Sequence, residues 1–593
     1  MNVYVRFRVS ASFGEFKGRH AKIREELALI TRETNSKSAN KRDSPFGCHK
    51  SSPRRLSPEV GVWGVSSSGR EMSNAMSPIV SAVARDPRRV GARRRVSSRA
   101  AERLWGRHLA VASASRWDVD GGGGVIFTAQ ELTAATGGEL VREGTPGSVS
   151  TDTRAVRSGQ WFLALTGERF DGDAFVDDAL AAGCAGVVST RAPPANWTAG
   201  YVRVKNATAA LQALAFDVRR RFEGPVVGIT GSVGKTTARD MCALALGNEE
   251  THATQGNFNN HVGLPLTILR ARPCARAWVL EMGMSAPGEI AALAAIARPN
   301  VRVVMNVAPA HLEGVGDVDG VARAKAEMFA SASEGDVCVV NAEDARVMGM
   351  PVPYGCRRVS FGTRGSGADV EVDGARLEDE RADDRTAVFP PRALRIRNGK
   401  ETVSVRLSEP GAHLAACAAC AAAVAVSTGV PLSDIGARLA AFESPKGRMR
   451  VSRDTATEIT VLDDAYNASP KSVSNAIETL RDARNRGHRT VVVLGDMLEL
   501  GSASHDLHVD ALTRCLDAGF DVVGVAGDAF SAAATRVAAD RADARDVVVA
   551  EDAESLWELI RDSASAKGSV VLVKGSRGMG MERIAQKLTS GES

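Results

Sequence analysis

Residues 229–237 have the composition of a phosphate-binding loop, because Gly, Lys and Thr follow an apolar run and precede a helical stretch. Gly231 and Gly234 let the backbone N–H groups turn toward phosphate oxygens, and Lys235 adds a positive charge beside them. Thr236 offers a hydroxyl that can bind Mg²⁺. The loop therefore predicts a nucleoside triphosphate site. Its residues are Gly231, Ser232, Val233, Gly234, Lys235, Thr236 and Thr237.

The loop is shorter than the common G-x-x-x-x-G-K-[ST] pattern, because Ile229 stands where that pattern has its first glycine. Taken alone, the loop is also compatible with a glycine-rich turn that binds no nucleotide. Two polar residues near the ends of neighbouring apolar runs favour the nucleotide. Glu281 ends one run and His311 follows another, and the carboxyl ends of parallel strands share the ligand-binding edge of a sheet.

Glu281 supplies the oxygen donor that a hard cation requires, so a magnesium site with Thr236 is expected. Two alternatives stay open at this point. Glu281 could cap a helix, and a lone histidine such as His311 is more often structural.

The elements that must position these residues form an α/β pattern. The length of 593 residues suggests about three or four domains. Apolar runs alternate with helical stretches, as in parallel sheets covered on both faces. We expect three domains: a small N-terminal α/β domain at 125–222, a central P-loop domain at 223–445 and a C-terminal Rossmann-like domain at 446–593. Expected strands are 160–165, 186–188, 225–230, 277–280, 301–305, 337–340, 459–462, 491–494, 521–525 and 569–573, and expected helices include 175–182, 207–221 and 238–246.

The front of the chain is basic. Residues 1–120 hold 24 Lys and Arg against 11 Asp and Glu, a net charge of +13 against +5 for the whole chain, which leaves −8 for the rest. Because the rest of the chain is acidic overall, binding of nucleic acid by a uniformly basic surface is disfavoured. Because residues 1–120 are rich in Arg and Ser and lack an apolar core, they resemble an organelle transit peptide. A disordered tail or a translation start placed too far upstream is the alternative.

Nine scattered cysteines indicate reduced thiols. Cys417 and Cys420 have no second ligand pair, so buried helix cysteines are favoured over a metal or redox site. The apolar stretch 412–430 is expected to be a core helix, since alanine inserts weakly into membranes. Residues 363–400 are charge-rich and irregular, which indicates a surface insertion or a poorly ordered hairpin.

Four segments follow one another along the chain: GITGSVGKTTARD, GNFNNHVGLPLTIL, LEMGMSAPGEI and NVAPAHLEGVGDVDGVARAKAEMF. In this order they resemble the Mur ligases, the ATP-dependent amide ligases that assemble peptidoglycan precursors. The resemblance covers 125–590. Within the family, 463–470, 494–501 and 573–577 are most similar to the D-alanyl-D-alanine-adding, MurF-type ligases, and the DNPR signature of the diaminopimelate- or lysine-adding relatives is absent.

The resemblance implies that ATP phosphorylates the peptide carboxylate of a UDP-MurNAc-tripeptide and that the amine of D-Ala-D-Ala attacks the acyl phosphate. Lys235 is then expected at the γ-phosphate, Thr236 and Glu281 at one Mg²⁺, and His311 near a second. Lys325 matches a lysine that is carbamylated in several members; the alternative is an ordinary lysine on a helix surface.

The resemblance also implies three sets of residues, which bind the UDP-sugar, the nucleotide and the dipeptide. Residues 166–172 are expected to assist the UDP-sugar set. One departure concerns adenine: many members carry G-x-H-N-x-x-N, but here Leu414 and Cys417 replace both asparagines. A raised KM for ATP or looser base choice is expected. The UDP-sugar set is Ser150, Thr151, Asp152, Thr153 and Arg154; the nucleotide set adds Arg448 and Asp464; the dipeptide set is Tyr466, Asn467, Lys574, Ser576 and Arg577.

Other functions stay open. They are a diaminopimelate-adding or folylpolyglutamate-type ligase, a catalytically silent organellar scaffold of the same fold, and a generic P-loop phosphotransferase or GTPase. The cofactors expected are ATP and Mg²⁺, with a CO₂-derived carbamate on Lys325. We expect a monomer that binds neither nucleic acid nor membrane, in the plastid stroma if 1–120 are a transit peptide and in the cytoplasm otherwise.

Overall fold

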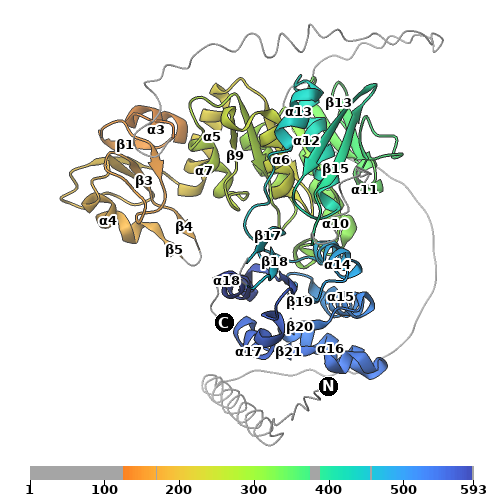
Figure 1. Ribbon diagram of the computed structural model, residues 1–593. Helices are drawn as coiled ribbons and strands as arrows, with labels where there is room; N and C mark the ends of the chain where they lie inside the picture. The colour runs from red at the N-terminus through yellow and green to blue at the C-terminus, as the bar shows by residue number, and fades with distance from the viewer. Residues whose placement is uncertain (1–123, 168–169, 374–387, 455–456, 591–593) are drawn as a thin grey trace, which may run out of the picture. The chain divides into compact units, whose positions relative to one another are not determined.

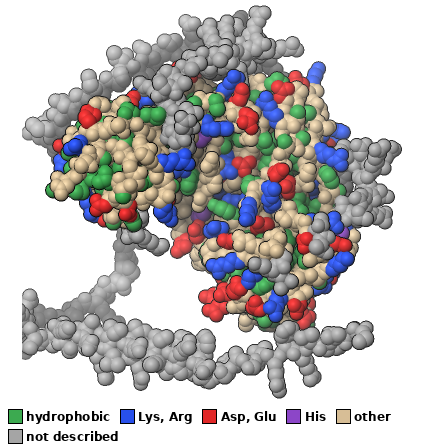
Figure 2. All heavy atoms as spheres, turned by 60° about the vertical axis from the view of Figure 1, so that its left-hand side comes forward, with side chains coloured by type: hydrophobic (Ala, Val, Ile, Leu, Met, Phe, Trp, Pro, Cys, Tyr) green, Lys and Arg blue, Asp and Glu red, His purple; other side chains and the backbone are tan. Residues whose placement is uncertain are grey.

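The computed structural model describes residues 124–593 except 168–169, 374–387, 455–456 and 591–593. Three α/β units follow one another along the chain, each built on its own sheet (Figure 1). The proposed transit peptide lies outside the described residues. On the face that Figure 2 displays, Lys and Arg are interspersed with Asp and Glu, so the two signs of charge alternate there.

The N-terminal unit has a five-stranded sheet in the order β1-β7-β6-β3-β2. Its core holds the aromatic side chains of Trp161 and Phe162, which lie on opposite faces of β3. The expected strands and helices here are present, but α3, β1, β2, β4, β5 and β7 were not predicted. The elements are α3 (Ala129–Thr136), β1 (Glu139–Arg142), β2 (Val149–Ser150), β3 (Trp161–Leu163), α4 (Val176–Ala181), β6 (Gly186–Ser189), β7 (Gly200–Arg203) and α5 (Ala207–Arg221), with a separate hairpin of β4 (Thr166–Gly167) and β5 (Phe170–Asp171).

The central unit has a nine-stranded sheet in the order β16-β15-β14-β13-β12-β11-β8-β10-β9. Successive residues of β8 alternate between two cores: Val226 packs toward α5, α7, α8 and α10, and Val227 toward α6, α12 and α13. The unbroken apolar runs thus form parallel strands buried on both faces, as expected. The strands are β8 (Val226–Thr230), β9 (Thr251–Ala253), β10 (Ala277–Glu281), β11 (Val301–Val304), β12 (Val337–Asn341), β13 (Arg357–Thr363), β14 (Val370–Asp373), β15 (Arg392–Asn398) and β16 (Glu401–Leu407). The helices are α6 (Lys235–Leu246), α7 (Gly263–Leu269), α8 (Glu289–Ala297), α9 (Leu312–Val315), α10 (Val318–Ala330), α11 (Ala345–Met348), α12 (His413–Ser427) and α13 (Leu432–Leu439).

The expectation of an irregular insertion at 363–400 was wrong for its described ends. β14 pairs parallel with β13, and β15 pairs antiparallel with both β14 and β16, so they extend the central sheet. In β15, Leu394 and Ile396 are buried while Arg395 and Arg397 are exposed. Alternation places the charged residues on the solvent face of an edge region, which explains why the segment is charge-rich and yet ordered. Figure 1 shows α12 and α13 beside β15.

The C-terminal unit has a six-stranded sheet in the order β17-β18-β22-β19-β20-β21, parallel except for β17. Because β22 lies between β18 and β19, the ends of three parallel strands meet near Lys574. The strands are β17 (Arg450–Arg453), β18 (Thr460–Asp464), β19 (Thr490–Gly495), β20 (Val522–Ala526), β21 (Val548–Ala550) and β22 (Val570–Lys574). The helices are α14 (Pro470–Asn485), α15 (Ser504–Ala518), α16 (Asp528–Asp540), α17 (Ala553–Ala564) and α18 (Glu582–Ser590).

The alanine-rich helix α12 lies in the core of the central unit, as expected, and Cys417 and Cys420 are buried in it. None of the helices within the described ranges has the length and apolar character needed to cross a bilayer. The eight cysteines that the structure describes are all free thiols.

Candidate nucleotide and ligation site

The phosphate loop joins β8 to α6 and is held from one side by Asn306. The Asn306 side-chain oxygen accepts hydrogen bonds from the backbone N–H groups of Ser232 and Val233, at 3.1 and 2.9 Å. Its amide nitrogen donates to the carbonyl of Val233 at 2.9 Å. Ser232 also donates its hydroxyl hydrogen to the carbonyl of Ala308 at 2.9 Å. These bonds fix the loop to the carboxyl end of β11.

Two glycines of the loop are required by geometry. Gly234 has φ +82°, a left-handed conformation that side chains other than glycine seldom adopt. A Cβ atom on Gly231 would lie 2.7 Å from Cβ of Met305, so the loop could not approach β11 as closely. The glycine pattern seen in the sequence therefore has a structural cause at both positions.

Glu281 is buried at the carboxyl end of β10, where the parallel register places it beside Ile229 of β8. Its carboxylate accepts hydrogen bonds from the Thr236 hydroxyl at 2.9 Å and from the Asn259 side-chain amide at 2.8 Å. Arg239 Nη1 lies 3.5 Å from the same carboxylate. These contacts hold Glu281 and Thr236 together at the edge of the cavity, where both side chains offer oxygen atoms.

Near this edge lie two lysines, of which Lys235 is half-buried and lines the cavity while Lys325 is fully buried. Lys235 donates from Nζ to the carbonyl of Gly231 at 2.8 Å. Burial lowers the pKa of Lys235, while the nearby Glu281 carboxylate opposes that shift. The Lys325 side chain on α10 is 1% exposed, and burial with the charge of Lys235 lowers its pKa well below the usual range. This burial shows that the alternative of a surface lysine was wrong.

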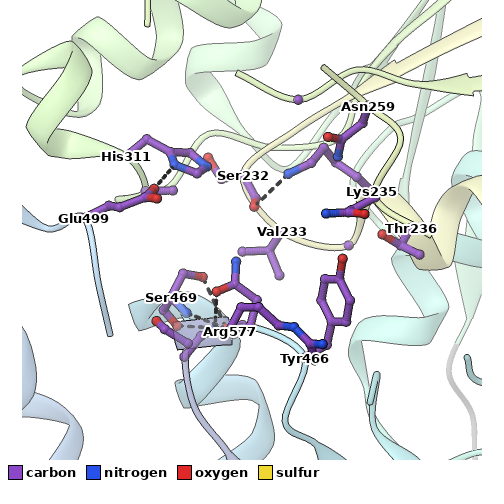
Figure 3. Close-up of a pocket in the computed structure, with 18 of the residues that line it drawn as sticks. Ser232, Val233, Lys235, Thr236, Asn259, His311, Tyr466, Ser469, Glu499 and Arg577 are labelled. Atoms are coloured by element: carbon purple, nitrogen blue, oxygen red, sulfur yellow. Dashed lines mark hydrogen bonds and ion pairs between the residues drawn. The ribbon is translucent and has the colours of Figure 1, made fainter. Parts of the chain in front are cut away.

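His311 stands at the start of α9 and contacts the C-terminal unit. Its Nδ1 donates to the Glu499 carboxylate at 2.5 Å (Figure 3). Burial lowers the pKa of His311, the hydrogen bond to Glu499 opposes the shift, and the charges of Lys235 and Lys325 add to it. The histidine thus lies within electrostatic range of both lysines.

The edge of the C-terminal sheet is organised by Lys574, which is 2% exposed. Its Nζ lies 2.6 Å from the Asp464 carboxylate and donates to the carbonyl of Asn467 at 2.9 Å. Burial lowers the pKa of Lys574, and Asp464 opposes that shift. Lys574 therefore fixes the loop that carries Tyr466.

Two arginines contact the ring of Tyr466. The Arg448 guanidinium carbon lies 4.0 Å from the ring centroid, and that of Arg577 lies 5.7 Å away. Both distances are within the range of cation–π interaction. The ring therefore lies between two positive charges, and Figure 3 shows it beside Arg577.

A cavity of about 790 Å³ brings most of the expected residues together. From the central unit it is lined by Ser232, Val233, Gly234, Lys235, Thr236, Thr237, Glu281 and His311, and from the C-terminal unit by Arg448, Asp464, Tyr466, Asn467, Lys574, Ser576 and Arg577. Gly231 and Lys325 are not lining residues, since the first faces β11 and the second is buried.

The expected UDP-sugar residues, 150–154, do not line this cavity. Ser150 is buried in β2, and Asp152 forms an ion pair with Arg154 at 2.8 Å. The hydrogen bond from Arg154 lowers the pKa of Asp152. Residues 168–169 of the assisting segment lie outside the described ranges. The assignment of 150–154 therefore stays a prediction.

The segment that departs from the family pattern begins helix α12. His413 lines the cavity, and its buried Nδ1 has no hydrogen-bond partner among the described residues. Leu414 and Cys417 are buried in the core and do not line the cavity. Cys417 Sγ lies 3.9 Å from the carbonyl of Gly234, so it packs behind the phosphate loop.

Sequence reasoning assigned no role to three residues of the site: Asn306, Asn259 and Glu499. The first two lie in segments shared with the family, and Asn306 directly follows the end of a strand. That position at the sheet edge was the available signal. Glu499 also lies in such a segment, 494–501, but its contact with His311 joins residues 188 positions apart and could not be read from the sequence.

A phosphate loop on a parallel sheet, facing a second parallel-sheet unit across one cavity, defines a multidomain nucleotide-binding α/β protein. The chain belongs to the Mur ligase family: residues 229–425 match the Mur ligase middle domain and 447–577 match the Mur ligase glutamate ligase domain. It is 33% identical over 467 residues to the UDP-N-acetylmuramoyl-tripeptide–D-alanyl-D-alanine ligase of Escherichia coli, covering 78% of this chain and 98% of the relative.

Solved structures of similar proteins agree with this family. A crystal structure of MurF from Acinetobacter baumannii has a TM-score of 0.69 at 29% identity, covering 79% of this chain and 99% of that one. MurF ligase from Thermotoga maritima in complex with ADP has a TM-score of 0.64 at 28% identity, covering 75% and 99%.

Proposed function

We propose that this chain is an ATP-dependent ligase that joins D-alanyl-D-alanine to a UDP-MurNAc-tripeptide. The observation that carries the proposal is the shared cavity, in which the loop with Lys235 and the Thr236–Glu281 pair face Arg448 and Tyr466. The printed name of the Escherichia coli relative supports the choice of substrates. A catalytically silent scaffold would have no physical reason to keep this arrangement of charges.

Cleavage of ATP to ADP and phosphate supplies the driving force, and the reaction has two steps. The tripeptide carboxylate attacks the γ-phosphorus, so a carboxyl–phosphate bond forms and ADP leaves. The amine of D-Ala-D-Ala then attacks the acyl carbon, phosphate leaves, and one proton is lost from the nitrogen. Lys235 binds the γ-phosphate, and Arg448 approaches it from the opposite wall. Positioning and charge neutralisation provide most of the catalysis.

Mg²⁺ fits the oxygen donors of Thr236 and Glu281. Within the described part of the chain there is no group of three or more His, Cys, Asp or Glu side chains that could hold a metal by itself. This agrees with a preference for few protein ligands together with water and phosphate oxygens. When bound, the ion neutralises charge that develops on the transferring phosphoryl group. We propose His311 as a ligand near a second ion, on the basis of the resemblance to the family.

Lys325 is the residue we infer to carry a carbamate. Only a neutral amine reacts with CO₂, and burial with a neighbouring positive charge keeps the pKa of Lys325 well below its ordinary value. No hydrogen bond or ion pair to its Nζ is present within the described ranges. A carbamate would place a negative charge opposite Lys235.

The deciding experiment measures phosphate release from ATP with UDP-MurNAc-tripeptide, with and without D-Ala-D-Ala. Release that depends on both substrates is expected, and Lys235→Ala should abolish it. Parallel reactions with diaminopimelate or glutamate as the amine, each with its own acceptor, test the alternative ligases. Turnover with one of these and none with D-Ala-D-Ala would contradict the proposal.

We also propose that 1–120 form a plastid transit peptide, that 150–154 contact the UDP-sugar and that the enzyme is a monomer. The Arg- and Ser-rich composition of the front segment supports the first point. A fluorescent reporter fused to 1–120 should enter plastids, and a cytosolic signal would contradict this. Sedimentation of the full chain measures its mass in solution, and a mass of two or more chains would contradict the monomer.

A further inference from the structure

Glu499 has no assigned role, although it lines the same cavity as the phosphate loop. Its carboxylate accepts the hydrogen bond from Nδ1 of His311 at 2.5 Å, and its backbone carbonyl accepts one from the N–H of Glu313 at 3.4 Å. Two contacts therefore join the loop after β19 to the residues at the start of α9.

Both members of this pair adopt a backbone conformation that favours glycine. Glu499 has φ +64° and His311 has φ +54°. The backbone of a residue other than glycine is strained in this left-handed conformation. Such strain persists only where the surrounding structure imposes it, and it is frequent at functional sites. Gly501, two residues later, has φ +56° without a side chain. A glutamate at position 499 is thus not explained by the turn itself.

The loop that carries Glu499 is fixed by hydrogen bonds on both sides. The carboxylate of Asp496 accepts from the N–H groups of Ala529 and Phe530 at the start of α16, at 3.0 and 2.9 Å. The N–H of Leu498 donates to the Ser576 hydroxyl at 2.9 Å. The Glu499 carboxylate is therefore presented to His311 by a rigid support.

We propose that Glu499 is a positioning residue that sets the tautomer and orientation of His311; its place in the reaction rests on the proposed function. A neutral imidazole has one N–H donor and one acceptor nitrogen. Because Nδ1–H is committed to Glu499, Nε2 keeps its lone pair, and Figure 3 shows the ring between Glu499 and Ser232 of the phosphate loop. A carboxylate partner also fixes the ring and raises its basicity.

The test compares Glu499→Ala, Glu499→Gln and Glu499→Gly with Glu458→Ala in the full chain. Glu458 is a matched control, since it also has a positive φ of +60° and an ion pair, to Lys567 at 3.3 Å, but does not line the cavity. ¹⁵N-histidine NMR, with the His311 signals assigned by subtracting a His311→Ala spectrum, reports the tautomer. Steady-state kinetics report kcat and KM.

We expect Glu499→Ala and Glu499→Gly to lower kcat about 10- to 100-fold and to move His311 to the Nε2–H tautomer, while KM for D-Ala-D-Ala stays within about twofold. Glu499→Gln keeps an acceptor oxygen, so it should keep the wild-type tautomer and recover most of kcat. Glu499→Gly should melt no lower than wild type, because glycine accepts this φ. Glu458→Ala should match wild type in kcat and in tautomer.

An unchanged tautomer in Glu499→Ala, or a kcat within about threefold of wild type, would overturn the proposal. An equal loss of kcat in Glu458→Ala would do the same. Because the NMR measurement needs no substrate, it still tests the positioning of His311 if the wild-type chain fails to ligate D-Ala-D-Ala. Failure of the proposed function and failure of this inference are therefore distinguishable.

Discussion

Replacement of Asn306 by alanine is expected to weaken nucleotide binding strongly, although this side chain lies under the phosphate loop and is not a lining residue of the cavity. Its amide makes three hydrogen bonds to the backbone of Ser232 and Val233. Alanine removes all three and leaves the N–H and the carbonyl of Val233 without these partners, while the N–H of Ser232 keeps its hydrogen bond to the backbone carbonyl of residue 306 at 3.1 Å. The loop would then populate other conformations when no nucleotide is bound.

The expected loss of nucleotide affinity follows from the number of hydrogen bonds that the substitution removes. Each hydrogen bond of this kind contributes about 1 kcal/mol net, so the two bonds to Val233 stabilise the loop by about 2 kcal/mol. If the nucleotide must order the loop on binding, the same free energy is subtracted from the binding energy. Since a tenfold change in Kd corresponds to about 1.4 kcal/mol, Kd should rise about 30-fold.

Isothermal titration of the full chain with ADP measures this effect, and Asn300→Ala is the matched control. Asn300 accepts one hydrogen bond from the N–H of Val226, at 2.8 Å, at the opposite end of β8. Its loss should lower stability by about 1 kcal/mol and leave Kd unchanged. A Kd for Asn306→Ala within about threefold of wild type, or an equal loss in Asn300→Ala, would refute the reasoning.

Three further predictions concern other parts of the central unit. Depleting dissolved CO₂ should slow the wild-type enzyme, and Lys325→Ala should lose activity at least about 100-fold if a carbamate is essential; phosphate release measures both, and CO₂-independent turnover would contradict the carbamate. Burial lowers the pKa of His252 to about 4, so only the unfolded chain gains a proton at this residue as the pH falls from 6.5 to 4, and the free energy of unfolding drops by about 3 kcal/mol over that range. His252→Gln should flatten this part of the plot of unfolding free energy against pH, measured by urea denaturation. An unaltered plot would exclude His252 as the source of the pH dependence. Leu414 and Cys417 are buried and do not line the cavity, so Leu414→Asn combined with Cys417→Asn tests the expectation taken from the family pattern, which is a lower KM for ATP and a higher preference for ATP over GTP; equal values in steady-state assays would show that these departures do not affect base recognition.

The fold was predictable where both faces of a strand are buried. Such strands are unbroken apolar runs in the sequence, and β8, β10, β11 and β12 were all expected. The strands missed or misjudged include β16 and β17, which end their sheets, and β15, which pairs with β16. Their solvent-facing residues are charged, so composition alone does not separate them from loops. Pairing with a neighbouring strand decides their structure.

The sequence by itself determined the phosphate loop, because its glycines, Lys235 and Thr236 act through local backbone geometry that nine consecutive residues encode. It also placed Glu281 at a strand end, which is a local property. Only the tertiary structure decided that Asn306 holds the loop, that Lys325 is buried and that Glu499 reaches His311. These depend on contacts between segments far apart in the chain, and their free energies arise from burial and hydrogen bonding that no local pattern records.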